Sequence, residues 1–179
     1  MEFYAMIFLS VLVNLPIGVV AYQKNSLRYP DGFIAAAVTG ILVFLAHPIL
    51  WALLLSFFAS SSYLSSYKEN TSEKSTAMLY ADKGGQRDSL QVFANGGTAV
   101  IGSIMVLYKI GLAESKYFSP LFLFVAVSFA SSAADTWATE IGTTSKSDPR
   151  WIFNLKKSVP KGTSGAVTIL GTTATALGA

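Results

Sequence analysis

Two carboxylates stand near the end of a long apolar stretch. The stretch begins near Tyr117, and its last residues, 131–142, read SSAADTWATEIG and include Asp135 and Glu140. A carboxylate in a membrane segment is costly and faces protein or water rather than lipid, so it indicates a site. Mg²⁺ in proteins is held by one or two carboxylates together with phosphate oxygens. We therefore predict Asp135 and Glu140 as Mg²⁺ ligands. The alternative is that Asp135 pairs with a basic side chain and that Glu140 is solvated.

The helix that would carry Asp135 also carries hydroxyl groups on the same face. At about 100° per residue, four side chains fall within about 60° of Asp135: Ser128, Ser131, Ser132 and Thr139. Glu140 would lie about 140° away on a continued helix. Because Gly142 follows closely, we expect the helix to end near Thr139, which would let Glu140 turn toward Asp135.

A second set of polar residues leads into another apolar run, in the sequence DKGGQRDSLQVFANGG at 82–97. Arg87, Gln91 and Asn95 are spaced by four, which places them on one face of a helix. Arginine binds phosphate bidentately, and a helix N-terminus attracts anions. The predicted phosphate-binding residues of this segment are Lys83, Arg87, Gln91, Asn95 and Gly96. Alternatively, Arg87 extends its charge to the membrane surface and residues 95–97 pack against a neighbouring helix.

A third set is VPKGTSGAV at 159–167, directly before an apolar run that we expect to be helical from about Thr163. A lysine beside free N–H groups at a helix start can bind an anion, and Thr163 or Ser164 can cap that helix. The spacing of a P-loop is absent. We predict phosphate-binding roles for Lys161, Gly162, Thr163 and Gly165, although such residues are also common at helix starts.

The segments that position these residues are apolar. The 179 residues are 52% hydrophobic and 13% charged, whereas soluble domains carry about 25% charged residues. Apolar runs near 20 residues predict membrane helices. We expect an all-α, polytopic bundle forming a single integral membrane domain over residues 1–179. About six transmembrane helices are predicted, over about 3–22, 33–46, 48–67, 90–110, 118–139 and from 163 to the chain end, where the last helix is short enough to look truncated.

Positive charge is distributed unevenly over the predicted loops. All but two of the 13 lysines and arginines lie on the face reached after the first helix, the exceptions being Lys109 and Lys116. Cytoplasmic loops carry such an excess, so we expect the N-terminus outside and the charged loops in the cytoplasm. The three polar sets share that face, which predicts one common site. The net charge of +3 is too small and too dispersed to indicate nucleic acid, and the absence of cysteine excludes thiolate sites.

Four sequence pieces together resemble a known family. GGQRDSLQVFANGG, SSAADTWATEIGT, DPRW and VPKGTSGAVTILGT are similar, in this order, to the transmembrane protein 19 family, also called domain of unknown function 92. Its best-understood branch is plant and cyanobacterial phytyl-phosphate kinase. The resemblance covers most of the chain. It implies Mg²⁺-dependent phosphoryl transfer from a nucleoside triphosphate, CTP or ATP, to a prenyl or phytyl monophosphate at the cytoplasmic membrane face. Members usually continue with further C-terminal helices, so we expect those to be missing here.

The resemblance also implies residue roles. The catalytic residues would be Asp135, Arg87 and Glu140, while Lys161 stands at a variable position of the pattern. The partners would be the nucleotide, the prenyl phosphate and membrane lipid, with the oligomeric state left open. One alternative is CTP-dependent cytidylyl transfer to a lipid phosphate, which differs in its product. The other is a membrane transporter, which the clustering of charges at one face disfavours.

Overall fold

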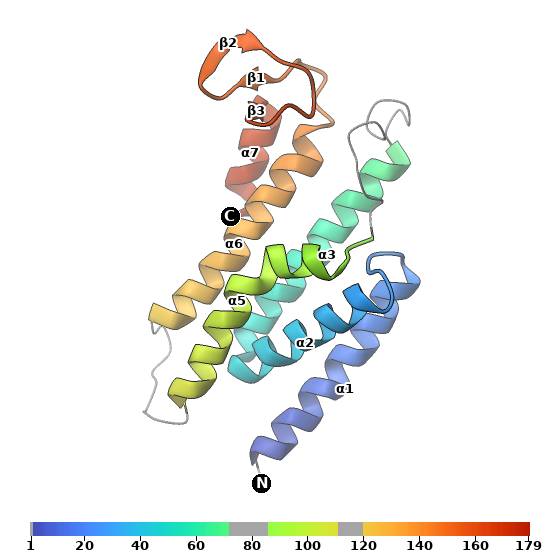
Figure 1. Ribbon diagram of the computed structural model, residues 1–179, viewed down its shortest axis with the longest axis vertical. Coiled ribbons are helices and arrows are strands. Elements are labelled where there is room, and N and C mark those ends of the chain that lie inside the picture. The colour runs from blue at the N-terminus through green and yellow to red at the C-terminus, as the bar shows by residue number, and fades with distance from the viewer. Residues whose placement is uncertain (1, 72–85, 111–119) are drawn as a thin grey trace. The chain divides into compact units, whose positions relative to one another are not determined.

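Long apolar helices dominate the computed structural model, which describes residues 2–71, 86–110 and 120–179 (Figure 1). Four of them are long and apolar enough to cross a membrane: α1 (Glu2–Gln23), α3 (Pro48–Thr71), α5 (Ser89–Ile110) and α6 (Pro120–Gly142). Two further apolar helices are shorter: α2 (Asp31–Ala46) and α7 (Ile169–Gly178). The predicted all-α membrane architecture is confirmed. The first five helices lie within a few residues of their predicted bounds.

The break between α2 and α3 lies at His47 and Pro48, as the sequence predicts. His47 has an extended backbone, and its Nδ1 accepts a hydrogen bond from the N–H of Ile49 at 3.1 Å. Proline is well suited to the first position of a helix, where its missing N–H has no partner to lose. The apolar run from α2 to α3 therefore becomes two helices rather than one.

Met1–Phe58 and Gln86–Phe129 form one compact unit of the structure. In this unit α2 packs against both α1 and α5. The approach of α1 to α2 depends on Gly40, because a Cβ atom there would lie 2.1 Å from Oδ1 of Asn14. On the other side of α2, a Cβ atom on Gly96 of α5 would lie 3.5 Å from the Thr39 methyl group. Small residues thus permit close packing of the helices.

The loop between α1 and α2 forms backbone hydrogen bonds with Arg87, which lies two residues before the start of α5. The N–H of Arg87 donates to the Ser26 carbonyl, and the Arg87 carbonyl accepts from the N–H of Arg28, both at 3.0 Å. Gly32 lies so close that a Cβ atom there would be 2.1 Å from the Arg87 carbonyl oxygen. The backbone of Arg87 is therefore fixed by a segment that lies about sixty residues earlier in the sequence. This separation is roughly ten times the length of a typical loop.

The described residues of Ala59–Gly85, together with Ala130–Ala179, form the second compact unit. Its helices α6 and α7 run antiparallel, since Gly142 contacts Gly171 near one end and Gly178 contacts Trp137 near the other. A Cβ atom on Gly171 would lie 3.1 Å from the Ala138 carbonyl oxygen, which shows how closely these helices approach. The expectation of a single integral membrane domain stays a prediction.

A small antiparallel sheet joins α6 to α7, and the sequence did not predict it. Its strands are β1 (Arg150–Trp151), β2 (Asn154–Ser158) and β3 (Ala166–Val167), in the order β2-β1-β3. The prediction that the last helix starts near Thr163 is wrong, because α7 begins at Ile169. Its N-cap is Thr168, whose Oγ1 accepts from the N–H of Gly171 at 3.0 Å. The predicted caps, Thr163 and Ser164, lie in turns before β3.

Candidate functional site

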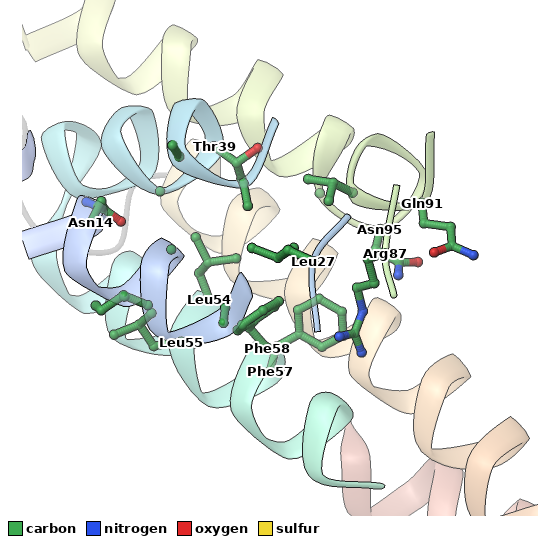
Figure 2. A pocket seen from close by; sticks show the side chains of 18 residues that line it. Asn14, Leu27, Thr39, Leu54, Leu55, Phe57, Phe58, Arg87, Gln91 and Asn95 are labelled. Atoms are coloured by element: carbon green, nitrogen blue, oxygen red, sulfur yellow. The ribbon is translucent and has the colours of Figure 1, made fainter. Parts of the chain in front are cut away.

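A cavity of about 70 Å³ lies within the first unit, between α1, α2, α3 and α5 (Figure 2). Its walls are mainly apolar: Ile17, Leu27, Leu54, Leu55, Phe57 and Phe58. Arg87, Gln91 and Asn95 gather at one end, and Asn14 lies at the other, as Figure 2 shows. The cavity therefore joins apolar walls to a cationic and amide-bearing end, a combination that suits an amphiphilic ligand.

Arg87 supplies the positive charge of this cavity. Its guanidinium carbon lies 5.3 Å from the ring centroid of Phe58, in a cation–π contact that orients the side chain. The side chain is half-buried, so it is partly desolvated, and its attraction for an anion is stronger than that of a fully solvated cation. Because its backbone is tied to Ser26 and Arg28, the position of this charge is set by the fold.

Gln91, Asn95 and Gly96 line the same cavity as Arg87. The structure thus brings together four of the five residues predicted in this segment. Helical spacing explains this for Gln91 and Asn95, whereas Arg87 precedes α5 and is placed by its backbone hydrogen bonds to Ser26 and Arg28. The fifth, Lys83, lies outside the described residues. Gln91 already has one local partner, since its Oε1 accepts from the N–H of Asp88 at 3.3 Å. Its role toward a ligand stays a prediction.

The buried polar groups deeper in the cavity were not singled out from the sequence. Asn14 accepts a hydrogen bond from Nε1 of Trp51 at 3.0 Å and donates one to the Ser10 carbonyl at 2.8 Å. Thr39 is 3% exposed, and its hydroxyl has no hydrogen-bond partner among the residues that the structure describes. An amide in the middle of an apolar run was the available signal for Asn14. For Thr39 no signal existed, because a hydroxyl in an apolar helix usually bonds within its own helix.

In the second unit, α6 carries the two predicted metal ligands. The expectation that this helix ends near Thr139 is wrong: it continues to Gly142. Asp135 and Glu140 therefore remain about 140° apart around the helix axis. Asp135 is exposed, whereas Glu140 is half-buried and accepts a hydrogen bond from the Ser65 hydroxyl at 2.9 Å.

The fit of Mg²⁺ to these carboxylates is partial. Across residues 2–71, 86–110 and 120–179, no three His, Cys, Asp or Glu side chains are grouped as a metal site would require. A Mg²⁺ ion bound through one carboxylate and phosphate oxygens suits this donor set. One ion held by Asp135 and Glu140 together does not fit the continuous helix. The metal-binding roles stay predictions, and Asp135, with its exposed carboxylate, is the better placed of the two.

Lys161 and the residues after it form turns rather than a helix start. The Lys161 ammonium donates to the carbonyls of Ser145, at 2.6 Å, and Thr143, at 3.5 Å, just beyond the end of α6. A cation at a helix C-terminus is favourable because it complements the helix dipole. This contact gives Lys161 a structural role, and its role in phosphate binding stays a prediction.

The backbone conformation explains why glycine occurs at positions 162 and 165. The N–H of Thr163 bonds the Pro160 carbonyl, and the N–H of Ala166 bonds the Thr163 carbonyl, which defines two successive β-turns. Gly162, with φ 86°, and Gly165, with φ 75°, occupy the third positions of these turns. A positive φ there is typical of type II turns and favours glycine. Phosphate binding by Gly162, Thr163 and Gly165 stays a prediction.

The comparison with known proteins identifies the family. Residues 12–179 match the family model described as integral membrane protein DUF92. The chain belongs to the DUF92 family of integral membrane proteins. The resemblance seen in the sequence motifs is thereby confirmed.

Curated proteins similar to this DUF92 protein include one from a plant and one from an archaeon. The chain is 32% identical to Protein PGR of Arabidopsis thaliana over 169 residues, which cover 90% of the chain and 57% of PGR. It is 30% identical to an uncharacterized membrane protein of Methanocaldococcus jannaschii over 180 residues, which cover 100% of the chain and 69% of that protein. The chain therefore spans less than two thirds of the length of PGR. No solved structure matches it.

For the DUF92 protein, membrane integration follows from the family and from the four candidate spans. The side of the membrane on which the N-terminus and the charged loops lie stays a prediction. The predicted site residues divide between the two units. Arg87, Gln91, Asn95 and Gly96 belong to the first unit, while the second holds Asp135, Glu140, Lys161, Gly162, Thr163 and Gly165. A common site formed by both groups also stays a prediction.

Proposed function

We propose that this DUF92 protein is a membrane isoprenoid-phosphate kinase, which transfers a phosphoryl group from a nucleoside triphosphate, CTP or ATP, to a prenyl or phytyl monophosphate. The observation that carries the proposal is the cavity with Arg87, Gln91 and Asn95 at one end and leucine and phenylalanine walls elsewhere. A prenyl phosphate has the matching construction, with a dianionic head and an apolar tail. The resemblance seen in the sequence motifs implies the same substrate class, and the membrane integration of the chain suits a substrate with a lipid-like tail.

The size of the cavity limits how much of the acceptor it can hold. Pockets for drug-sized ligands enclose about 300–1,000 Å³, whereas this cavity encloses about 70 Å³. It therefore takes the part of the acceptor nearest the phosphate, and the remaining isoprenoid chain lies among apolar helices and lipid. Recognition would then depend on the head and the first carbons more than on chain length.

The chemistry needs few protein groups. An oxygen of the acceptor phosphate attacks the γ-phosphorus of the nucleotide, the bond from that phosphorus to the β–γ bridging oxygen breaks, and a nucleoside diphosphate leaves. The acceptor oxygen is already anionic, so no general base is required. When bound, Mg²⁺ supplies charge neutralisation on the nucleotide phosphates. Arg87 would hold the acceptor phosphate bidentately, and Asn95 would orient it. Asp135 is the carboxylate that we assign to the metal.

The direct test is an assay of the purified protein in lipid nanodiscs with Mg²⁺, γ-labelled CTP or ATP, and a panel of prenyl monophosphates. We expect label in the prenyl diphosphate and release of a nucleoside diphosphate. Asp135→Asn should reduce turnover by at least about 100-fold, as is typical when a charge-stabilising group is removed. Asp148→Asn is the matched control, because Asp148 is an exposed carboxylate in the following loop with no assigned role.

Two results would contradict the proposal in different ways. Release of pyrophosphate with the nucleotide joined to the lipid phosphate would identify a cytidylyltransferase instead. Flux of a solute into vesicles with no nucleotide turnover would identify a transporter. A fully active Asp135→Asn variant would remove the metal assignment while leaving the acceptor cavity to be tested separately.

A further inference from the structure

The tip of the β1–β2 hairpin is apolar and exposed. β1 and β2 are joined by the two-residue turn Ile152-Phe153, since Trp151 pairs with Asn154. Phe153 is 83% exposed and Ile152 is 53% exposed. Leu155 on β2 is also exposed, and the rings of Trp151 and Phe153 contact each other with centroids 5.4 Å apart. Four neighbouring apolar side chains of the hairpin are thus exposed, and of these Trp151 and Ile152 also lie near Gly165.

Local turn chemistry does not explain this composition. Two-residue hairpin turns favour Asn, Asp and Gly, whose backbones accept the required angles and whose surfaces suit water. Isoleucine and phenylalanine neither adopt those backbone angles readily nor suit a surface exposed to water. Residues that break a local rule without a compensating contact in the fold are expected at functional sites. The turn is therefore expected to be covered by another surface when the protein is in its native environment.

Basic side chains flank the apolar tip. Lys156 and Lys157 lie on β2, and both are exposed. The Lys157 ammonium is 5.5 Å from the ring centroid of Trp151. Arg150 on β1 donates from Nη1 to the Leu155 carbonyl at 2.9 Å, which holds its charge at the same hairpin. An apolar tip with cations behind it complements an anionic lipid surface, where apolar groups enter the interface and cations meet headgroups.

The place of the hairpin in the chain suits such a surface. The candidate span α6 ends at Gly142, and the apolar helix α7 begins at Ile169. Gly142 and Gly171 are in contact, so the sheet emerges where the end of α6 meets the start of α7 (Figure 1). The hairpin starts eight residues after the end of α6, which is long and apolar enough to cross the bilayer. At about 3.5 Å per residue, the hairpin therefore begins at most about 28 Å from that end.

We propose that the β1–β2 hairpin is a membrane-interface anchor, with the Ile152-Phe153 turn inserted among the lipid headgroups and Lys156 and Lys157 bound to anionic lipid. Tryptophan is favoured at this depth because its ring is apolar and its N–H is polar, and phenylalanine supplies apolar area that enters the interface. The anchor holds the turns at 160–166, which follow the hairpin, against the surface of the bilayer. It does not depend on which reaction the protein catalyses.

The chain contains no cysteine, so single nitroxide labels can be attached without background. Phe153→Cys carries the label at the tip, and Lys146→Cys, at an exposed position before the hairpin, is the matched control. The protein is reconstituted in vesicles of phosphatidylcholine alone or with about 30% phosphatidylglycerol, an anionic lipid. Collision of each label with oxygen, which concentrates in lipid, is compared with collision with a water-soluble nickel chelate.

We expect the ratio of oxygen to nickel accessibility to be several-fold higher at position 153 than at position 146, and to rise further with anionic lipid. Adding Lys156→Gln and Lys157→Gln should remove that further rise. Equal ratios at the two positions would overturn the proposal. A label at position 153 that neither reagent reaches would also overturn it, because the tip would then be covered by protein. Recovery of accessibility on diluting the protein in the vesicles would identify a second copy as the cover.

Discussion

Asp88 and Gln91 cap α5 reciprocally. Asp88 Oδ1 accepts a hydrogen bond from the N–H of Gln91 at 2.9 Å, and Gln91 Oε1 accepts one from the N–H of Asp88 at 3.3 Å. This is the arrangement of a capping box, which satisfies two backbone donors that the helix start would otherwise leave unpaired. A local cap therefore starts α5, and Gln91 takes part in that cap as well as lining the cavity.

The cap should be measurable as stability. Asp88→Ala removes the acceptor for the Gln91 N–H, so we expect a loss of about 1 kcal/mol in the free energy of unfolding. Asp88→Asn keeps a side-chain oxygen at the same place and should retain most of that stability. Denaturant unfolding in detergent, followed by circular dichroism, compares the two variants. Equal stability of Asp88→Ala and Asp88→Asn would show that the cap contributes nothing.

The contact of α1 with α2 should be sensitive to one methyl group. In Gly40→Ala the new Cβ atom would lie 2.1 Å from Oδ1 of Asn14, and we expect a destabilisation of about 1–3 kcal/mol, as for overpacked cores. Gly97→Ala on α5 is the matched control, because nothing lies within 4 Å of its new Cβ atom. Alanine is the better helix former, so this control should be neutral or stabilising. A Gly40→Ala variant as stable as Gly97→Ala would contradict the close approach.

Arg87 should act on acceptor binding if the proposed function is right. Hydrogen bonds to a charged group contribute about 1.5–3 kcal/mol, so Arg87→Ala should raise KM for the prenyl phosphate by about tenfold to hundredfold. Arg87→Lys should recover only part, because lysine cannot form the bidentate contact. Lys24→Ala removes an exposed cation of the same unit and serves as control. An unchanged KM in Arg87→Ala, at full stability, would exclude Arg87 from the acceptor site.

The stabilisation from the Arg28–Asp31 ion pair, which is hydrogen-bonded to the first residue of α5, should be lost in acid. Arg28 donates from Nε and Nη2 to the two carboxylate oxygens of Asp31, and the Ser89 N–H donates to Oδ2 at 3.0 Å. The Arg28 hydrogen bonds, followed by that from Ser89, hold the pKa of Asp31 well below its ordinary value. Because the folded-state pKa is the lower one, the unfolded chain takes up the proton first as the pH falls. The stabilisation is therefore present above about pH 4, the ordinary value for aspartate, and is lost below it.

The test of this linkage compares thermal unfolding of the wild type and Asp31→Asn in detergent between about pH 6 and pH 3. The wild type should be the more stable protein at pH 6, and the difference should shrink as the pH falls. Arg28→Gln removes the side chain that pairs with Asp31. The stability of this variant should therefore depend less on pH than that of the wild type. A stability difference that is constant over this range would show that Asp31 does not provide the linkage.

The membrane helices could be predicted because their signal is local. A run of about 20 apolar residues spans a bilayer whatever it packs against, so the bounds of α1, α3 and α5 follow from composition. The spacing of Gln91 and Asn95 likewise requires only the helical period. Arg87, by contrast, lies before α5 and reaches the same cavity because its backbone is bonded to the loop between α1 and α2. The D-x-x-Q pattern that starts at Asp88 is likewise a local signal, because it is the sequence signature of a capping box.

The sheet and the start of α7 could not be predicted in this way. β1 and β3 have two residues each and gain their hydrogen bonds only from one another and from β2, so no periodic pattern marks them. Thr163, Ser164 and Thr168 are all acceptable N-caps by type. The positive φ angles of Gly162 and Gly165, with the sheet pairing of Ala166, decide in favour of Thr168.

By itself, the sequence determined that this chain is an α-helical membrane protein with polar residues spaced for one helix face, because both properties depend only on composition and helical geometry. The tertiary structure alone decided that Leu27, Phe58 and Asn14 complete a cavity around that face, and that α6 keeps Asp135 and Glu140 apart. These outcomes depend on contacts between segments distant in sequence, or on where packing lets a helix end. Local residue types do not encode either.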